Sequence, residues 1–250
     1  MKARRAAVAG MFYPADPATL KRDIATLLAR APAVADGARV VIAPHAGYQY
    51  SGATAAHAYR QLESHRQHIR RVVLLGPAHR VYLKGMAIPS ADAFVTPLGD
   101  IELDADGLAQ VADLPGVQVS DEAHAAEHSI EVHLPFLQQV LGSFSLVPIV
   151  VGHATAEQVA NTLDELWGGA ETLIVVSSDL SHFHPYEIAR EIDASTTARI
   201  EARQATLHGE DACGAYAVNG LLLAATSHGL QVRTLDVRNS GDTAGDKSRV

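Results

Sequence analysis

The sequence predicts an α/β architecture with a largely parallel or mixed sheet. Short apolar runs alternate along the chain with helical stretches, as in sheets covered by helices. Three of the runs are each followed closely by a histidine: Val40 to Ile42 by His45, Val72 to Leu75 by His79, and Leu173 to Val176 by His182. In open α/β sheets the ligand crevice lies outside the carboxyl ends of the strands. The three histidines are therefore expected near one crevice.

Length and composition narrow the class of protein. A chain of 250 residues with 48% hydrophobic and 19% charged residues is expected to fold as one globular domain spanning residues 1–250. The net charge of −8 gives no basic face for nucleic acid. No apolar run approaches the ~20 residues of a membrane helix. Cys213 is the one cysteine, so no intramolecular disulfide is possible, and a cytoplasmic location is expected.

The first half of the chain carries local signals for each element. Asp16 followed by Pro17 is typical of a helix N-cap, and the helix is predicted to reach about Arg30. The alanine-rich stretch from Ser51 to Leu62 is predicted to be the helix that leaves the His45 turn. The other predicted elements are a linker from Pro32 to Gly37, extended segments within Lys84 to Asp100, a short helix from Asp104 to Val111 and a short strand from Val117 to Val119.

The second half continues the alternation. Ser129 to Leu141 is predicted to be helical, with Pro135 forcing a late start or a kink. Thr155 and Gln158 have the spacing of a capping box, which opens a helix to about Trp167. The other predicted elements are a buried strand from Leu146 to Val151, a helix from about Pro185 to Arg203, a helix capped by Asp211 and ended by Gly229, a strand from Val232 to Val237, and a solvated turn from Asn239 to Asp246, with a lid as its alternative.

The residue types at the strand ends suit a metal. His45, His79 and Asp179 follow strand ends, and Cys213 lies two residues after the predicted cap Asp211. A helix N-terminus there would lower the thiol pKa and favour a metal-binding thiolate. Two imidazoles and a thiolate suit zinc, copper or iron. Because the set is scattered, the competing interpretation is that the histidines cap strand ends by hydrogen bonds and the cysteine is a small buried hydrophobe.

The densest polar cluster runs from Glu127 to His133. His128 and His133 are five residues apart and would not share a helix face. Glu127 and His128 could point into a pocket, whereas His133 is predicted to be a packing or surface residue. Neither the Gly-x-Ser-x-Gly elbow nor a glycine-rich nucleotide fingerprint occurs, so the sequence gives no support for a serine hydrolase of the α/β type or for a nucleotide site.

Several motifs, in order and over almost the whole chain, resemble the Memo family, also named AmmeMemoRadiSam system protein B. They are Val8 to Pro14, Ala43 to Tyr48, Leu75 to His79, Glu127 to Pro135, Ser177 to His182 and Asn239 to Asp242. The family is similar in fold to the class III extradiol ring-cleaving dioxygenases, which are non-haem iron enzymes. The resemblance therefore implies a three-layer αβα sandwich.

The same resemblance implies roles for individual residues. His45 and His79 match two metal-ligating histidines, and Cys213 matches the third ligand, a position that is glutamate in the dioxygenases. His182 matches an acid/base position, and Asp179 lies beside it to orient the ring. The remaining matched positions are expected to line the pocket: Tyr48, Glu127, His128 and Ser178.

The function implied is metal-dependent redox chemistry on a small molecule or a peptide, with one iron or copper ion per chain. Thiolate in place of carboxylate softens the site and favours copper over the usual iron triad. Two alternatives stay open: a non-catalytic peptide- or protein-binding module that uses the same pocket, and a zinc-dependent hydrolase with a ligand position left for water. The family name implies an AmmeCR-type protein and a radical SAM protein as partners. Members usually carry a last strand beyond the Asn239 loop, so that strand is expected to be missing at Val250.

Overall fold

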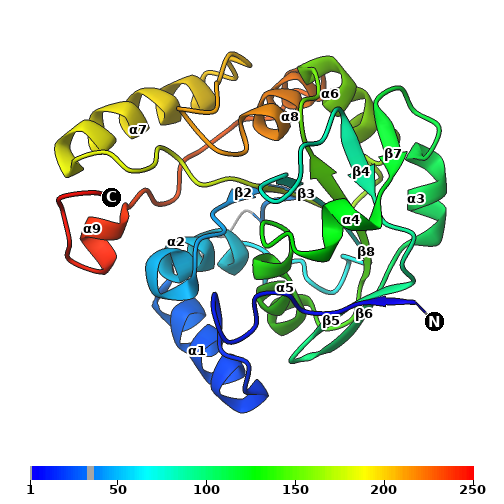
Figure 1. Ribbon diagram of the computed structural model, residues 1–250, viewed down its shortest axis with the longest axis horizontal. Coiled ribbons are helices and arrows are strands. Elements are labelled where there is room, and N and C mark those ends of the chain that lie inside the picture. Colours follow the sequence, from blue (N-terminus) through cyan, green and yellow to red (C-terminus); the bar gives the residue numbers. More distant parts are fainter. Residues whose placement is uncertain (1, 33–36) are drawn as a thin grey trace.

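The computed structural model describes residues 2–32 and 37–250, and its centre is a six-stranded sheet (Figure 1). In spatial order the strands are β2 (Val40–Ala43), β9 (Thr172–Ser177), β3 (Arg71–Pro77), β8 (Ser145–Val151), β4 (Met86–Ile88) and β7 (Val117–Val119). The first four run parallel, and β4 pairs antiparallel with β8 and parallel with β7. The expected mixed, largely parallel sheet is confirmed.

Helices cover both faces of this sheet. One face carries α1 (Pro17–Arg30), α2 (Tyr48–Arg60) and α5 (Leu134–Leu141), and the other carries α3 (Ala105–Val111), α6 (Ala156–Glu165) and α8 (Ala215–Ser227). Successive side chains of a strand point to opposite faces. In β3, Val72 and Leu74 accordingly belong to the first core, and Val73 and Leu75 to the second. The αβα sandwich is confirmed.

The remaining elements lie around this sandwich. They are the small sheet of β1 (Ala3–Arg4), β5 (Ala93–Thr96) and β6 (Gly99–Glu102), the helices α4 (Asp121–Ala125), α7 (Tyr186–Glu201) and α9 (Ser240–Thr243), and the 3₁₀ turn Glu131–His133. Fully buried Glu131 fixes the N-terminal segment: it pairs with Arg4 and accepts hydrogen bonds from the Val8 amide (2.9 Å) and the Tyr13 hydroxyl (2.6 Å). Among the described helices, none is long and apolar enough to cross a membrane.

Most local signals gave the right element. Asp16 caps α1 by accepting from the Thr19 amide, and the capping box of Thr155 and Gln158 opens α6. The extended pieces within 84–100 become β4, β5 and the start of β6. Pro135 enforces the late start, because a 3₁₀ turn precedes α5 and the proline lies in its first turn. The predicted linker 32–37 lies mostly outside the described residues.

Three predictions for the C-terminal part are wrong. Residues 232–237 form no strand, because they have no ladder partner among the described residues and Thr234 donates its amide to Glu201 instead. Asp211 does not cap a helix; it accepts from the His208 amide, and α8 begins at Ala215 with Gly214 as its N-cap. The turn after Asn239 contains the short helix α9, which Asn239 caps.

Gly76 in β3 offers a direct test of the packing beneath the strand end. A Cβ at this position would lie 2.5 Å from Ser129 Oγ and 3.0 Å from Ser129 Cβ. We expect Gly76→Ala to lower the free energy of unfolding by about 1–3 kcal/mol, the usual cost of overpacking. Urea denaturation measures the change. Gly209→Ala is the control, since a Cβ there meets no atom of the described residues within 4 Å; equal stabilities of the two variants would contradict the packing argument.

Candidate metal centre

The candidate site lies where three adjacent parallel strands end. β9 pairs with β2 on one side and β3 on the other, so their carboxyl ends share one edge of the sheet. His45, Asp179 and His79 each follow the last residue of their strand by two positions. The sheet topology therefore brings together side chains that are far apart in the sequence, as the strand-end pattern predicted.

His45, His79 and Cys213 converge at this edge. Each offers a ligand atom, and the three atoms lie within 4.8 Å of one another. His45 Nε2 is 3.4 Å from Cys213 Sγ. A tetrahedral metal with bonds of about 2.3 Å to sulfur and about 2.0 Å to nitrogen would separate these two atoms by roughly 3.5 Å. The spacing and the chemistry of the donor set both fit a metal ion.

His79 is held by the carboxylate of Glu127. His79 Nδ1 lies 2.9 Å from Oε1, and the His79 amide donates to Oε2 at 2.6 Å. The same carboxylate accepts from the amides of His128 and Ser129, each at 2.9 Å. Although burial opposes ionisation, the hydrogen bonds from the His79 ring and from the amides of His79 and Ser129 lower the pKa of Glu127 to about 2. A carboxylate at Nδ1 leaves Nε2 free for a metal, so the contacts of Glu127 are those of a residue that supports the His79 ring.

His45 is almost completely buried, at 1% exposure. Its Nδ1 contacts Ser177 Oγ at 2.5 Å, which leaves Nε2 to face Cys213. Ser177 also contacts His133 Nε2 at 2.7 Å. Burial lowers the pKa of His45, and it lowers that of His133 to about 3, so both rings are neutral at neutral pH. Neutral imidazole is the form that binds metals.

The position of Cys213 and the pKa of its thiol both differ from the sequence prediction. It lies in the turn before α8, not in the first turn of the helix. Burial, reinforced by the nearby Asp179 carboxylate, raises the pKa of the thiol to about 12. The predicted lowering of the thiol pKa is wrong, because it assumed a cap at Asp211. The metal-free protein therefore carries a thiol, whose sulfur accepts a hydrogen bond from the Asp179 amide at 3.3 Å.

Asp179 lies between His45 and His182. One carboxylate oxygen accepts from the His45 amide at 2.8 Å, and the other is 3.7 Å from His45 Nε2 and 3.9 Å from His182 Nε2. Burial opposes ionisation, but the neighbouring His45 ring and amide lower the pKa of Asp179. His182 is oriented instead by the Leu180 carbonyl, 2.6 Å from its Nδ1. Asp179 thus holds the His45 turn and is too far from His182 to hydrogen-bond to it.

The other expected pocket residues have varied environments. Tyr48 packs in the core against Tyr13 and Phe136, and its hydroxyl donates to the Val132 carbonyl at 2.9 Å, so it does not line the site. His128 stacks on His79 with ring centroids 4.6 Å apart, and its buried Nδ1 has no hydrogen-bond partner among the described residues, although Glu127 Oε1 lies 3.3 Å away. Ser178 accepts from the Gly214 amide at 3.0 Å, which ties β9 to the Cys213 turn.

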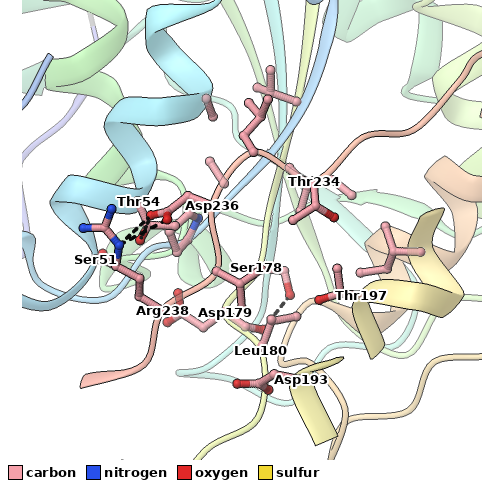
Figure 2. A pocket seen from close by; sticks show the side chains of 18 of the residues that line it. Ser51, Thr54, Ser178, Asp179, Leu180, Asp193, Thr197, Thr234, Asp236 and Arg238 are labelled. Atoms are coloured by element: carbon pink, nitrogen blue, oxygen red, sulfur yellow. Dashed lines mark hydrogen bonds and ion pairs between the residues drawn. The ribbon is translucent and has the colours of Figure 1, made fainter. Parts of the chain in front are cut away.

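A groove of about 1240 Å³ borders this cluster on the side of Asp179 and His182. It lies between β2, α2, α7 and the segment 230–240. Figure 2 shows Ser178, Asp179 and Leu180 on one part of its wall and Thr54, Asp236 and Arg238 on another. Thr54 donates to Asp236 at 2.9 Å and so links α2 to the C-terminal segment. The groove gives the cluster an open flank large enough for an extended ligand.

Sequence reasoning missed the residues that support the ligands from behind. The motifs that contain Ser177 and Ser129 indicate no supporting role for either residue, and no local pattern marks Tyr59. Their contribution depends on tertiary contacts that local patterns do not encode. His133 was expected to pack or lie on the surface, and it is buried.

Comparison with known proteins agrees with these motifs. Residues 4–250 match the family model described as "Memo-like protein". The chain is 36% identical to a MEMO1 family protein of Aquifex aeolicus, over 100% of this chain and 97% of that one. It is also 36% identical to a MEMO1 family protein of Methanothermobacter thermautotrophicus, over 99% and 97% of the two chains.

The structure is distantly similar to that of the uncharacterised protein JW3007 from Escherichia coli K12. The TM-score is 0.40 and the identity 14%, over 67% of this chain and 80% of that one, which is too remote to carry an argument. The family assignment depends instead on the match along almost the whole sequence and on relatives of nearly the same length. The chain belongs to the Memo-like protein family.

Proposed function

We propose that the protein binds one redox metal, iron or copper, through His45, His79 and Cys213, and that this centre supports redox chemistry on a small molecule or a peptide. The observation that carries the proposal is the convergence of the three donors. His45 Nε2 and Cys213 Sγ have the separation of two ligands of one metal, and both histidines have Nδ1 engaged elsewhere. A second residue that hydrogen-bonds to Nδ1 of a histidine is typical of histidines that bind a metal through Nε2.

The chain's own residues have distinct roles in this proposal. A bound metal would supply Lewis acidity and electron transfer. His182 is partly exposed and its Nδ1 is occupied by the Leu180 carbonyl, so Nε2 is free to take up a proton near Cys213 and Asp179. Substrate would approach from the groove, which His182 and Asp179 line.

Metal analysis of protein purified without oxygen, followed by oxygen uptake with added Fe(II) or Cu, tests the proposal. We expect about one metal ion per chain and metal-dependent oxygen consumption or electron transfer. Zinc in the purified protein, together with ester or amide hydrolysis that a chelator abolishes, would contradict it and favour the hydrolase. Absence of bound metal under every condition would refute the centre itself.

A second candidate function is ligand binding without turnover, which the size of the groove favours. In that case an extended peptide would bind equally well before and after chelation. Titration calorimetry with a peptide mixture, in the presence and absence of chelator, separates the two functions. The AmmeCR-type and radical SAM partners implied by the resemblance stay predictions.

The raised thiol pKa gives the metal centre a defined pH dependence. Cys213 must lose its proton to become a ligand, and with a pKa of about 12 it is a thiol throughout the neutral range. The apparent affinity for Co(II) should therefore rise about tenfold per pH unit between pH 7 and 9, one proton being released per metal. Competition titrations measure the slope. A flat profile in the wild-type protein would contradict thiolate ligation.

A further inference from the structure

A buried row of polar side chains extends from His45 into the core. Tyr59 OH lies 2.5 Å from His133 Nδ1, His133 Nε2 lies 2.7 Å from Ser177 Oγ, and Ser177 Oγ lies 2.5 Å from His45 Nδ1. All four residues are at most 1% exposed. A further contact joins Ser177 Oγ to the backbone carbonyl of Ser129 at 2.7 Å. The row therefore connects α2, the 3₁₀ turn and β9 to the candidate ligand.

The number of protons in this row determines which group donates to which. A carbonyl oxygen can only accept, so the Ser129 contact requires the single hydroxyl proton of Ser177. Ser177 then has no proton left for either ring, and both rings must donate to its oxygen. Because a neutral imidazole carries one N–H, His133 holds its proton on Nε2 and His45 on Nδ1. The remaining nitrogen of His133 accepts the Tyr59 hydroxyl proton, which satisfies every contact.

The opposite arrangement, in which the Ser177 hydroxyl donates to His45, leaves one of these contacts without a proton. If Ser177 donated to His45 Nδ1, its oxygen and the Ser129 carbonyl would face each other at 2.7 Å without a proton between them. The His45 proton would also be on Nε2, directed toward Cys213 Sγ. A buried acceptor without its donor is costly, so the geometry selects one tautomer.

We infer that Tyr59, His133 and Ser177 are positioning residues that hold His45 as the Nδ1–H tautomer and so direct its Nε2 lone pair at the metal position. For His79 the carboxylate of Glu127 has the same effect. Ser129 joins the two supports, since its amide donates to Glu127 at 2.9 Å and its carbonyl accepts from Ser177. The inference rests on the proposed metal site, but the tautomer itself is a property of the metal-free protein.

Nitrogen-15 NMR of the histidine rings in the metal-free full-length chain tests the tautomer directly. The His45 signals are identified by their absence from the His45→Gln spectrum. We expect a protonated Nδ1 and an unprotonated Nε2; the reverse pattern would overturn the inference. This result is independent of metal binding, so an Nδ1–H ring in a protein that binds no metal would refute the proposed function and leave the inference standing.

Substitutions then test whether the row acts on metal binding. Ser177→Ala should remove the preference for the Nδ1–H tautomer and lower the Co(II) affinity about 10–100-fold, as for other residues behind a ligand. Thr162→Val is a matched control, because it removes another fully buried hydroxyl, one that donates to the Gln158 carbonyl in α6. Wild-type tautomer and affinity in Ser177→Ala would contradict the inference. If Ser177→Ala does not fold, the nitrogen-15 spectrum of the wild-type protein still shows which tautomer His45 adopts and so tests the inference.

Discussion

Replacing Cys213 by alanine is expected to abolish stoichiometric metal binding, with a loss of affinity for Co(II) or Fe(II) well beyond the roughly 10–100-fold typical of residues behind a ligand. The thiolate is the anionic donor of the set, and without it two neutral imidazoles would have to hold a dication. His45→Ala should have an effect of the same order, since His45 Nε2 faces the sulfur at 3.4 Å. Equilibrium dialysis with metal analysis measures both.

The spectrum of the Co(II) form adds a readout specific to sulfur. The wild-type protein should show a thiolate-to-metal charge-transfer band that disappears in Cys213→Ala. His68→Ala, which removes an exposed histidine away from the cluster, should bind metal normally and keep the band. If Cys213→Ala and His45→Ala both bind metal as well as the wild type, the ligand assignment is wrong. Comparison of the metal-free unfolding curves shows whether either variant has lost its fold.

Periodicity and capping predicted the sandwich because their causes are local. The buried strands are apolar on both faces, so Val72 to Leu75 reads as a continuous apolar run, and helices such as α1 and α6 begin at side chains that cap their first turn. The segment 232–237 mixes apolar and polar residues, as a strand with one exposed face does, and yet it is not a strand. A strand also needs a neighbouring backbone to pair with, and no local pattern shows whether the fold provides one.

The site was predictable to the extent that topology determines it. His45 and His79 could be placed together because both follow strands that end at one edge of a parallel sheet. The state of the Cys213 thiol could not, because its pKa depends on burial and on Asp179, which approaches from another strand end. The contacts of the Glu127 side chain could not be predicted either. Its carboxylate turns back to four N–H groups, and these contacts exist only in the folded chain.

Glu127→Gln is expected to weaken both the fold and the metal centre. The carboxylate is 2% exposed and accepts from His79 Nδ1 and from the amides of His79, His128 and Ser129. An amide group has one accepting oxygen, so its NH₂ would face at least one of these donors. We expect a loss of about 3 kcal/mol in the free energy of unfolding, by analogy with other buried charged acceptors. The Co(II) affinity should fall about 10–100-fold, because His79 is no longer held with Nε2 free.

The pH dependence of this loss identifies its cause. Glu127 has a pKa of about 2 in the folded protein and about 4.3 when unfolded, so its contribution is complete above the unfolded value and disappears as the pH falls through the folded one. The difference between wild type and Glu127→Gln in urea denaturation should therefore be largest near neutral pH and shrink below about pH 4. Glu122→Gln, at an exposed position of α4, should change neither stability nor affinity. If the difference in the free energy of unfolding stays constant down to pH 3, the variant is destabilised through altered packing. That result would contradict the role of the Glu127 carboxylate as the support of His79.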